Sequence, residues 1–268
     1  MKLVAIVRAA ADPGEAASAL ADASGLTLAE ARMRLAPEPP SLLARLEKEK
    51  ADALVARLRK SGLAALAVAL PVPTGKDRTL AHSFTLGEAG AVFVPRAGEP
   101  MQVRWADVLA IFRGQRASRS DVERTQTSKS FSAATAVMTG GLKLTRTSTR
   151  TAHSLEESTE QVILVYARDG QVAHLAEHQL EFSSLGPGMQ PSSAGNMAEL
   201  ARRLREKARG AFYDERLLRL GRRPLPFLTG GESRSQQGTV VTTRSDTSGS
   251  LDVLAEVMRQ AAAQGLLP

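Results

Sequence analysis

The sequence predicts an α+β protein: a small β-α-α-β-α-β module followed by a β-rich domain, a partial barrel closed by a helix. Three observations lead to this fold class. Apolar residues recur with helical spacing through most of the first 62 residues. From Leu80 to Phe182 the sequence contains several strand-like apolar runs separated by turn residues. Within this stretch, Asp169-Gly170 is a strong two-residue hairpin signal between two strand-like runs.

The first module is predicted from its helix-capping residues as well as from the spacing of its apolar residues. Asp12 is a good N-cap and Pro13 suits the first helical position. Thr27 and Glu30 form a capping box for a second helix, with Leu28, Ala31 and Leu35 expected on one face. The expected elements are a strand (2–10), a helix from Asp12 to Gly25, a helix after Thr27, a short apolar segment (42–46), a helix (47–61) and a strand (63–70).

The second domain is predicted to be a small sheet packed on one helix. LAHSFTLG (80–87) and GAVFVP (90–95) indicate a hairpin, and EQVILVYAR (160–168) should pair with QVAHLAEHQLEF (171–182). Residues 192–209 indicate an amphipathic helix with one apolar stripe.

The end of the chain is predicted to be a tether and a short helix. Residues 229–249 are rich in Gly, Ser and Thr and are expected to be flexible. A stripe of Leu251, Leu254, Ala255 and Met258 indicates a helix of about four turns, which must dock because it would be marginal alone in water. The predicted divisions are 1–73 (α/β module), 78–222 (β-rich domain), 223–249 (flexible linker) and 250–266 (terminal helix).

The first module resembles a known family. The resemblance rests on GLTLAEARMRL (25–35) and on ADAL (51–54) through RKSG (59–62). These runs resemble the C-terminal domain of the bacterial ribosomal stalk protein, whose fold is shared by the Clp protease adaptor. The resemblance implies contacts with a protein partner through Arg32 and Arg34. The adaptor's acidic and histidine pocket has no counterpart, because no histidine precedes His82.

The β-rich domain has a second, weaker resemblance. FVP (93–95), VRWADV (103–108) and Ile111 resemble bacterial pleckstrin-homology-like domains, with residues 115–139 as a long insertion. This resemblance implies binding of a lipid headgroup or a peptide rather than catalysis.

Positive charge is concentrated in the middle of the chain. Residues 100–152 contain nine Lys or Arg against three Asp or Glu, within a chain of formal net charge +7. Such a segment could bind phosphate groups of an anionic lipid or a nucleic acid, or it could be a solvated loop. The candidate phosphate-binding residues are Arg113, Arg116, Arg119, Arg124, Lys129, Lys143, Arg146 and Arg150.

Few residues are arranged for catalysis. The chain has no cysteine, which excludes disulfides, thiolate metal sites and a cysteine nucleophile. His174, Glu177 and His178 match the zinc-peptidase string H-x-x-E-H, which needs a helix. Alternation favours a strand, where the two histidines would lie about 13 Å apart along the chain. We therefore expect no catalytic residues, no metal and no cofactor.

These observations favour a non-enzymatic, adaptor-like interaction or regulatory protein of the cytoplasm that binds a protein partner. The N-terminal apolar run is too short for a signal peptide, and no stretch approaches the roughly 20 apolar residues of a transmembrane helix. The alternative is a phosphate-ligand binding module that uses the basic segment 113–150. A zinc hydrolase at His174, Glu177 and His178 is the second alternative.

Overall fold

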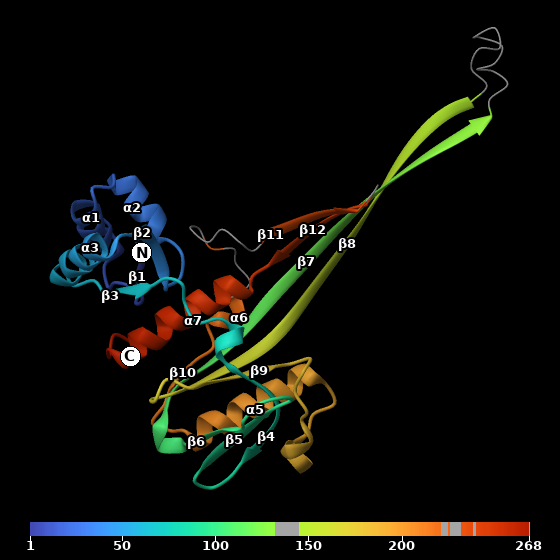
Figure 1. Cartoon of the computed structure of the whole chain (residues 1–268). Helices are drawn as coiled ribbons and strands as arrows, with labels where there is room; N and C mark the ends of the chain where they lie inside the picture. Colours follow the sequence, from blue (N-terminus) through green and yellow to red (C-terminus); the bar gives the residue numbers. More distant parts are fainter. Residues whose placement is uncertain (132–144, 221–224, 226–231, 238–239, 268) are drawn as a thin grey trace. The chain divides into compact units, whose positions relative to one another are not determined.

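The computed structural model describes residues 1–131, 145–220, 225, 232–237 and 240–267 (Figure 1). It is a mixed α+β structure, as predicted. The chain divides into two compact units. Unit 1 comprises Met1–Arg116, Thr159–Leu228 and Thr247–Pro268, and unit 2 comprises Ala117–Ser158 and Thr229–Asp246.

The N-terminal module of unit 1 has the predicted order of elements. These are β1 (Lys2–Ile6), α1 (Pro13–Ser24), α2 (Leu28–Leu35), β2 (Ser41–Leu46), α3 (Lys48–Lys60) and β3 (Ala65–Ala69). The Asp12 side chain accepts hydrogen bonds from the first turn of α1, and the capping box of Thr27 and Glu30 is present in α2. The strands form an antiparallel sheet in the order β2-β1-β3, and the three helices pack on one face of it.

The central domain contains a nine-stranded sheet. Its elements begin with β4 (Thr79–Leu86), β5 (Gly90–Pro95), β6 (Met101–Arg104), β7 (Val108–Phe131), β8 (Thr145–Ala167) and β9 (Val172–Ala176), followed by α5 (Ser193–Lys207), β10 (Phe212–Asp214) and α6 (Leu217–Leu220). The predicted hairpin is confirmed: β8 and β9 are antiparallel, and Gly170 takes the positive φ of 95° that the turn between them requires. Helix α5 packs against one face of the sheet.

Two stretches that the sequence suggested were irregular contain strands. Strand β7 extends to Phe131 and β8 begins at Thr145, so much of the basic segment is sheet and not loop. The predicted flexible tether contains β11 (Glu232–Gln237) and β12 (Val240–Asp246), with β12 antiparallel to β7. This polar segment forms strands because neighbouring strands satisfy its backbone hydrogen-bonding groups. The amino-acid composition of the segment does not predict that pairing.

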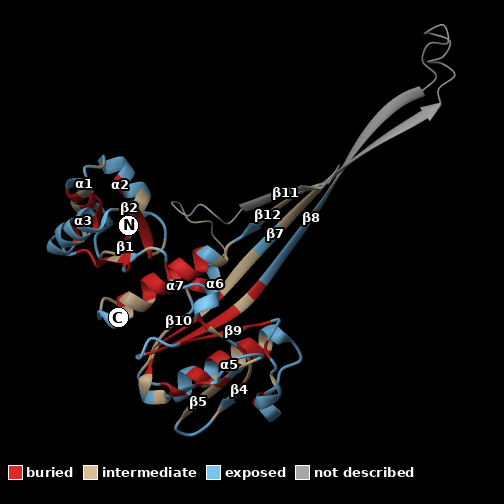
Figure 2. Cartoon of the chain, in the orientation of Figure 1, coloured by how far each residue is buried: buried red, intermediate tan, exposed pale blue. Residues whose placement is uncertain are grey.

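The terminal helix α7 (Ser248–Ala263) docks within its own chain. The predicted stripe, including Leu254 and Met258, packs in the cluster that holds residues of β7, β8 and β9. A second stripe of Val253, Val257 and Ala261 packs with the sheet of the N-terminal module, on the face opposite its three helices. Helix α7 is therefore buried along most of its length (Figure 2).

A charged pair lies buried at α7. Arg78 donates from Nη1 to Oδ1 of Asp252 at 2.5 Å, and the Arg78 side chain is 1% exposed. Its Nη2 also donates to the carbonyl of Pro73 at 3.1 Å. The Arg78–Asp252 ion pair therefore links the segment before β4 to the terminal helix α7.

Candidate interaction surfaces

Helix α2 presents an exposed face that is rich in apolar atoms. Leu28, Ala29, Arg32, Met33 and Ala36 are all exposed, with Met33 at 75% and Leu28 at 42%. Helical spacing places these five positions on one arc. We call this set the α2 surface. The sequence predicts Leu28, Ala31 and Leu35 on one apolar face, but of these three only Ala31 is buried.

The two arginines predicted to bind a partner have different environments. Arg34 is half-buried, and its Nη1 donates to the backbone carbonyl of Leu43. Leu43 is the extra residue at a register shift between β1 and β2, so its carbonyl lies where the ladder is irregular. Arg34 thus stabilises an edge strand, whereas Arg32 is exposed at the centre of the α2 surface.

Glu30, an acidic residue of α2, is engaged within its own helix. The Glu30 carboxylate accepts from Thr27 N at 2.9 Å and from Thr27 Oγ1 at 2.7 Å. Both hydrogen bonds, the backbone one more strongly, lower the pKa of Glu30. The capping box therefore holds this carboxylate at the start of α2.

The basic segment does not form one continuous phosphate site in the described residues. Arg113 donates to Gln161 at 2.9 Å and lies 3.4 Å from Glu215. Arg116 donates from Nε to Glu160 at 2.7 Å. Both guanidinium groups are therefore engaged within unit 1.

The remaining six candidates in this segment lie further along β7 and β8 or between them. Arg119 is exposed on β7. Lys143 lies outside the described residues, and so do the side chains of Arg124, Lys129, Arg146 and Arg150. Of the eight predicted phosphate ligands, only Arg119 is therefore shown as an exposed cation.

His174 lies on a strand, as predicted, whereas Glu177 and His178 lie in the turn that follows it, where the sequence predicts that the strand continues. His174 lies in β9 and is buried, whereas the His178 side chain is 56% exposed. Glu177 accepts hydrogen bonds from Gln161 N at 3.0 Å and from Ser193 Oγ at 2.6 Å. Within the residues that the structure describes, no group of three or more His, Asp or Glu side chains could hold a metal ion.

His174 belongs to a buried polar region that the sequence did not reveal. It lies on the same face of β9 as Val172 and Ala176, which pack in the cluster that also holds α7 residues. Its Nε2 has no hydrogen-bond partner among the described atoms. Burial, with smaller contributions from Arg78 and Arg116, lowers the pKa of His174 to about 4. His174 is therefore neutral at pH 7.

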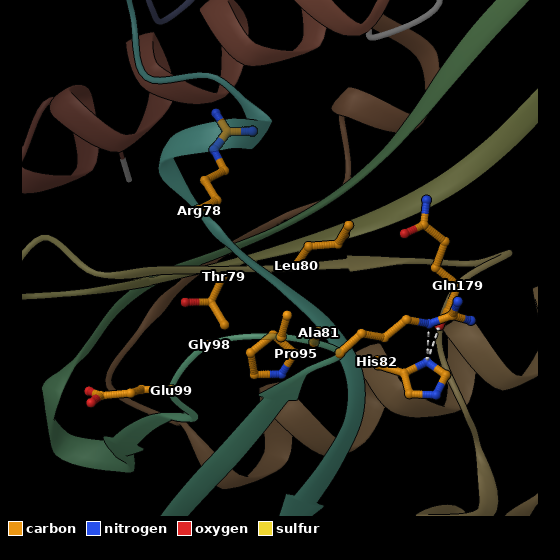
Figure 3. A pocket seen from close by; sticks show the side chains of 11 residues that line it. Arg78, Thr79, Leu80, Ala81, His82, Pro95, Gly98, Glu99 and Gln179 are labelled. Atoms are coloured by element: carbon orange, nitrogen blue, oxygen red, sulfur yellow. Dashed lines mark hydrogen bonds between the residues drawn. The ribbon is translucent and has the colours of Figure 1, made fainter.

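A depression of about 390 Å³ lies beside β4 and the end of β5 (Figure 3). His82 Nδ1 is 2.9 Å from the Gln179 carbonyl and 3.3 Å from Arg96 Nε, and its Nε2 is 3.1 Å from Glu181. Figure 3 shows Glu99 lying well apart from His82 and Gln179. The polar groups around His82 thus contact one another, and we assign this depression no ligand.

Comparison with known proteins assigns this chain to no family. Among the helices of the described residues, none has the length and hydropathy to cross a membrane. No protein-family model, curated protein or solved structure matches the chain.

Proposed function

We propose that this chain is a non-enzymatic interaction protein that binds a protein partner through the α2 surface. The observation that carries the proposal is the exposure of Met33 and Leu28 around Arg32 on one short helix. Methionine and arginine are enriched at protein interfaces, where the centre is apolar and fully desolvated. The resemblance to the ribosomal stalk and Clp adaptor fold supports the same helix.

The chemistry of the α2 surface specifies the kind of partner. Burying a side chain such as Leu or Met contributes roughly 1.5–3 kcal/mol relative to leaving it in water. Arg32 is not paired with Glu30, because the Glu30 carboxylate accepts its hydrogen bonds from Thr27. We expect a partner surface with an apolar patch and a carboxylate beside it.

A photo-crosslinking experiment in the native cell tests this proposal. A photoreactive amino acid replaces Met33 in one variant and Glu49, an exposed residue of α3, in the control. We expect one discrete crosslinked partner at position 33 and none at position 49. Adding Arg32→Glu should abolish the adduct, because charge reversal repels the partner carboxylate.

Arg57→Glu is the matched control, since it makes the same charge change on an exposed face of α3. Equal crosslinking at positions 33 and 49, or equal loss with Arg57→Glu and Arg32→Glu, would overturn the proposal. The alternative, phosphate binding through the basic segment, is measured by co-sedimentation of the full chain with anionic vesicles at increasing salt.

A further inference from the structure

A second surface of unit 1 is an open groove of about 650 Å³ beside β10. It is lined by residues that follow β1, α2 and α5, and by Leu267 near the end of the chain. An adjoining depression of about 620 Å³ shares Arg205, Phe212, Tyr213 and Leu267 with it. We call the two together the β10 groove.

Four arginines line the first part of the β10 groove, and two of them are paired within the chain. Arg216 forms an ion pair with Asp214 at 2.8 Å. Arg219 forms one with Glu38 at 2.7 Å. These pairs fix the walls and contribute little net charge.

The other two arginines are Arg8 and Arg205, so that the four arginines exceed the three carboxylates of this part of the groove by one positive charge, and Arg205 also attracts Glu215 electrostatically. Among the described residues, neither has a carboxylate within ion-pair distance. The third carboxylate of the groove, Glu215, accepts a hydrogen bond from Tyr213 at 2.5 Å and lies 3.4 Å from Arg113. The Glu215 carboxylate therefore already interacts with the Tyr213 hydroxyl and with the Arg113 guanidinium group.

Arg205 stacks on an aromatic ring of the groove. Its guanidinium carbon lies 5.0 Å from the centre of the Tyr213 ring. Stacking on an aromatic face leaves the edge N–H groups of a guanidinium able to donate to a carboxylate. Phe212 and Leu267 supply apolar wall beside it.

We infer that the β10 groove binds an extended acidic peptide segment of a partner protein, in which carboxylate side chains alternate with apolar ones. Arg8 and Arg205 would receive carboxylates, and Phe212 and Leu267 would receive apolar side chains. A nucleic acid fits less well, because it carries a charged phosphate at every nucleotide, whereas the carboxylates of an alternating peptide can be spaced away from Glu38, Asp214 and Glu215 on the same walls. Arg205 also covers one face of the Tyr213 ring, on which a base could stack.

This inference goes beyond the α2 surface and shares no residue with it. A variant of Arg32 or Met33 tests the proposed function, and a variant of Arg8 or Arg205 tests the groove. Failure of one therefore leaves the other standing.

The test uses the full chain and a short fluorescein-labelled peptide of alternating glutamate and leucine, with binding followed by fluorescence anisotropy. We expect saturable binding, and at least about a tenfold loss of affinity in Arg205→Gln and in Arg8→Gln, as for a lost charge-assisted hydrogen bond. Arg168→Gln is the matched control, because Arg168 is exposed and does not line the groove. It should change the affinity less than twofold.

Three outcomes would overturn the inference. The first is equal binding of a peptide with glutamine in place of glutamate. The second is an equal effect of Arg168→Gln and Arg205→Gln. The third is displacement of the peptide by single-stranded DNA at a lower concentration of negative charge, which would assign the groove to a nucleic acid. Circular dichroism of each variant verifies that the fold is retained.

Discussion

Helices α2 and α7 place apolar and charged side chains in opposite ways. Helix α7 buries Asp252 and Glu256, which are 9% and 5% exposed, while α2 leaves Leu28 and Met33 at 42% and 75%. Both helices have ordinary amphipathic sequences. The difference lies in their neighbours, because α7 packs with both sheets of unit 1 whereas α2 covers one side of a small module.

The comparison teaches how each helix is used. Burying a charge is costly unless a partner is present, and α7 has such partners in Arg78 and Arg259. Leaving large apolar side chains in water is tolerable on α2 only as isolated residues or as a contact surface. We therefore assign α7 to the stability of unit 1, and α2 carries the surface for which recognition is proposed.

The largest effect expected on α7 is that of Asp252→Ala. The substitution removes the carboxylate and leaves the Arg78 guanidinium buried with the Pro73 carbonyl as an acceptor, which should cost about 3–5 kcal/mol of unfolding free energy. Urea denaturation measures this loss. Replacing both partners, Arg78→Met with Asp252→Leu, should recover most of it. A loss below about 1 kcal/mol in the single variant would show that the pair does not hold α7.

Truncating one apolar side chain on each helix sharpens the comparison directly. Leu254→Ala on α7 should lower the unfolding free energy by about 2–5 kcal/mol, because Leu254 is 1% exposed and its loss leaves a cavity. Met33→Ala on α2 should stay within about 0.5 kcal/mol, as exposed substitutions do. Both values come from the same urea titration. Similar losses in the two variants would contradict the different roles given to the helices.

A pH-dependent effect concerns His174, close to the buried pair of α7. Its pKa is about 4 in the folded chain against an ordinary value of 6.5. Between these values the unfolded chain binds a proton that the folded chain does not, so stability is full above pH 6.5 and falls as the pH drops toward 4. The fall amounts to about 3 kcal/mol at most.

The measurement is the unfolding free energy as a function of pH, for the native chain and for His174→Leu. The variant should lack this part of the pH dependence. His178→Leu is the control, because the His178 side chain is 56% exposed and should leave the His174 contribution in place. A native slope that survives in His174→Leu would assign the acid sensitivity to other groups.

The sequence by itself determined the elements whose signals are local. The caps at Asp12 and Thr27 located two helices, and Asp169-Gly170 located the β8–β9 hairpin, because each signal acts within a few residues of the backbone it satisfies. The strand at His174 was likewise predictable, from the alternation of apolar and polar residues that follows Gly170. For the candidate site, the sequence indicated Arg32 but not the exposed apolar residues around it.

Only the tertiary structure decided which side chains are buried, paired or exposed. Arg78 and Asp252 are 174 positions apart, and no pattern in either neighbourhood predicts that they meet. The second apolar stripe of α7, the order in β11 and β12, and the intramolecular partners of Arg113 and Arg116 have the same origin. Each depends on a segment distant in the sequence that supplies a hydrogen bond, a charge or an apolar surface. Whether a side chain is buried therefore depends on which distant segment packs against it.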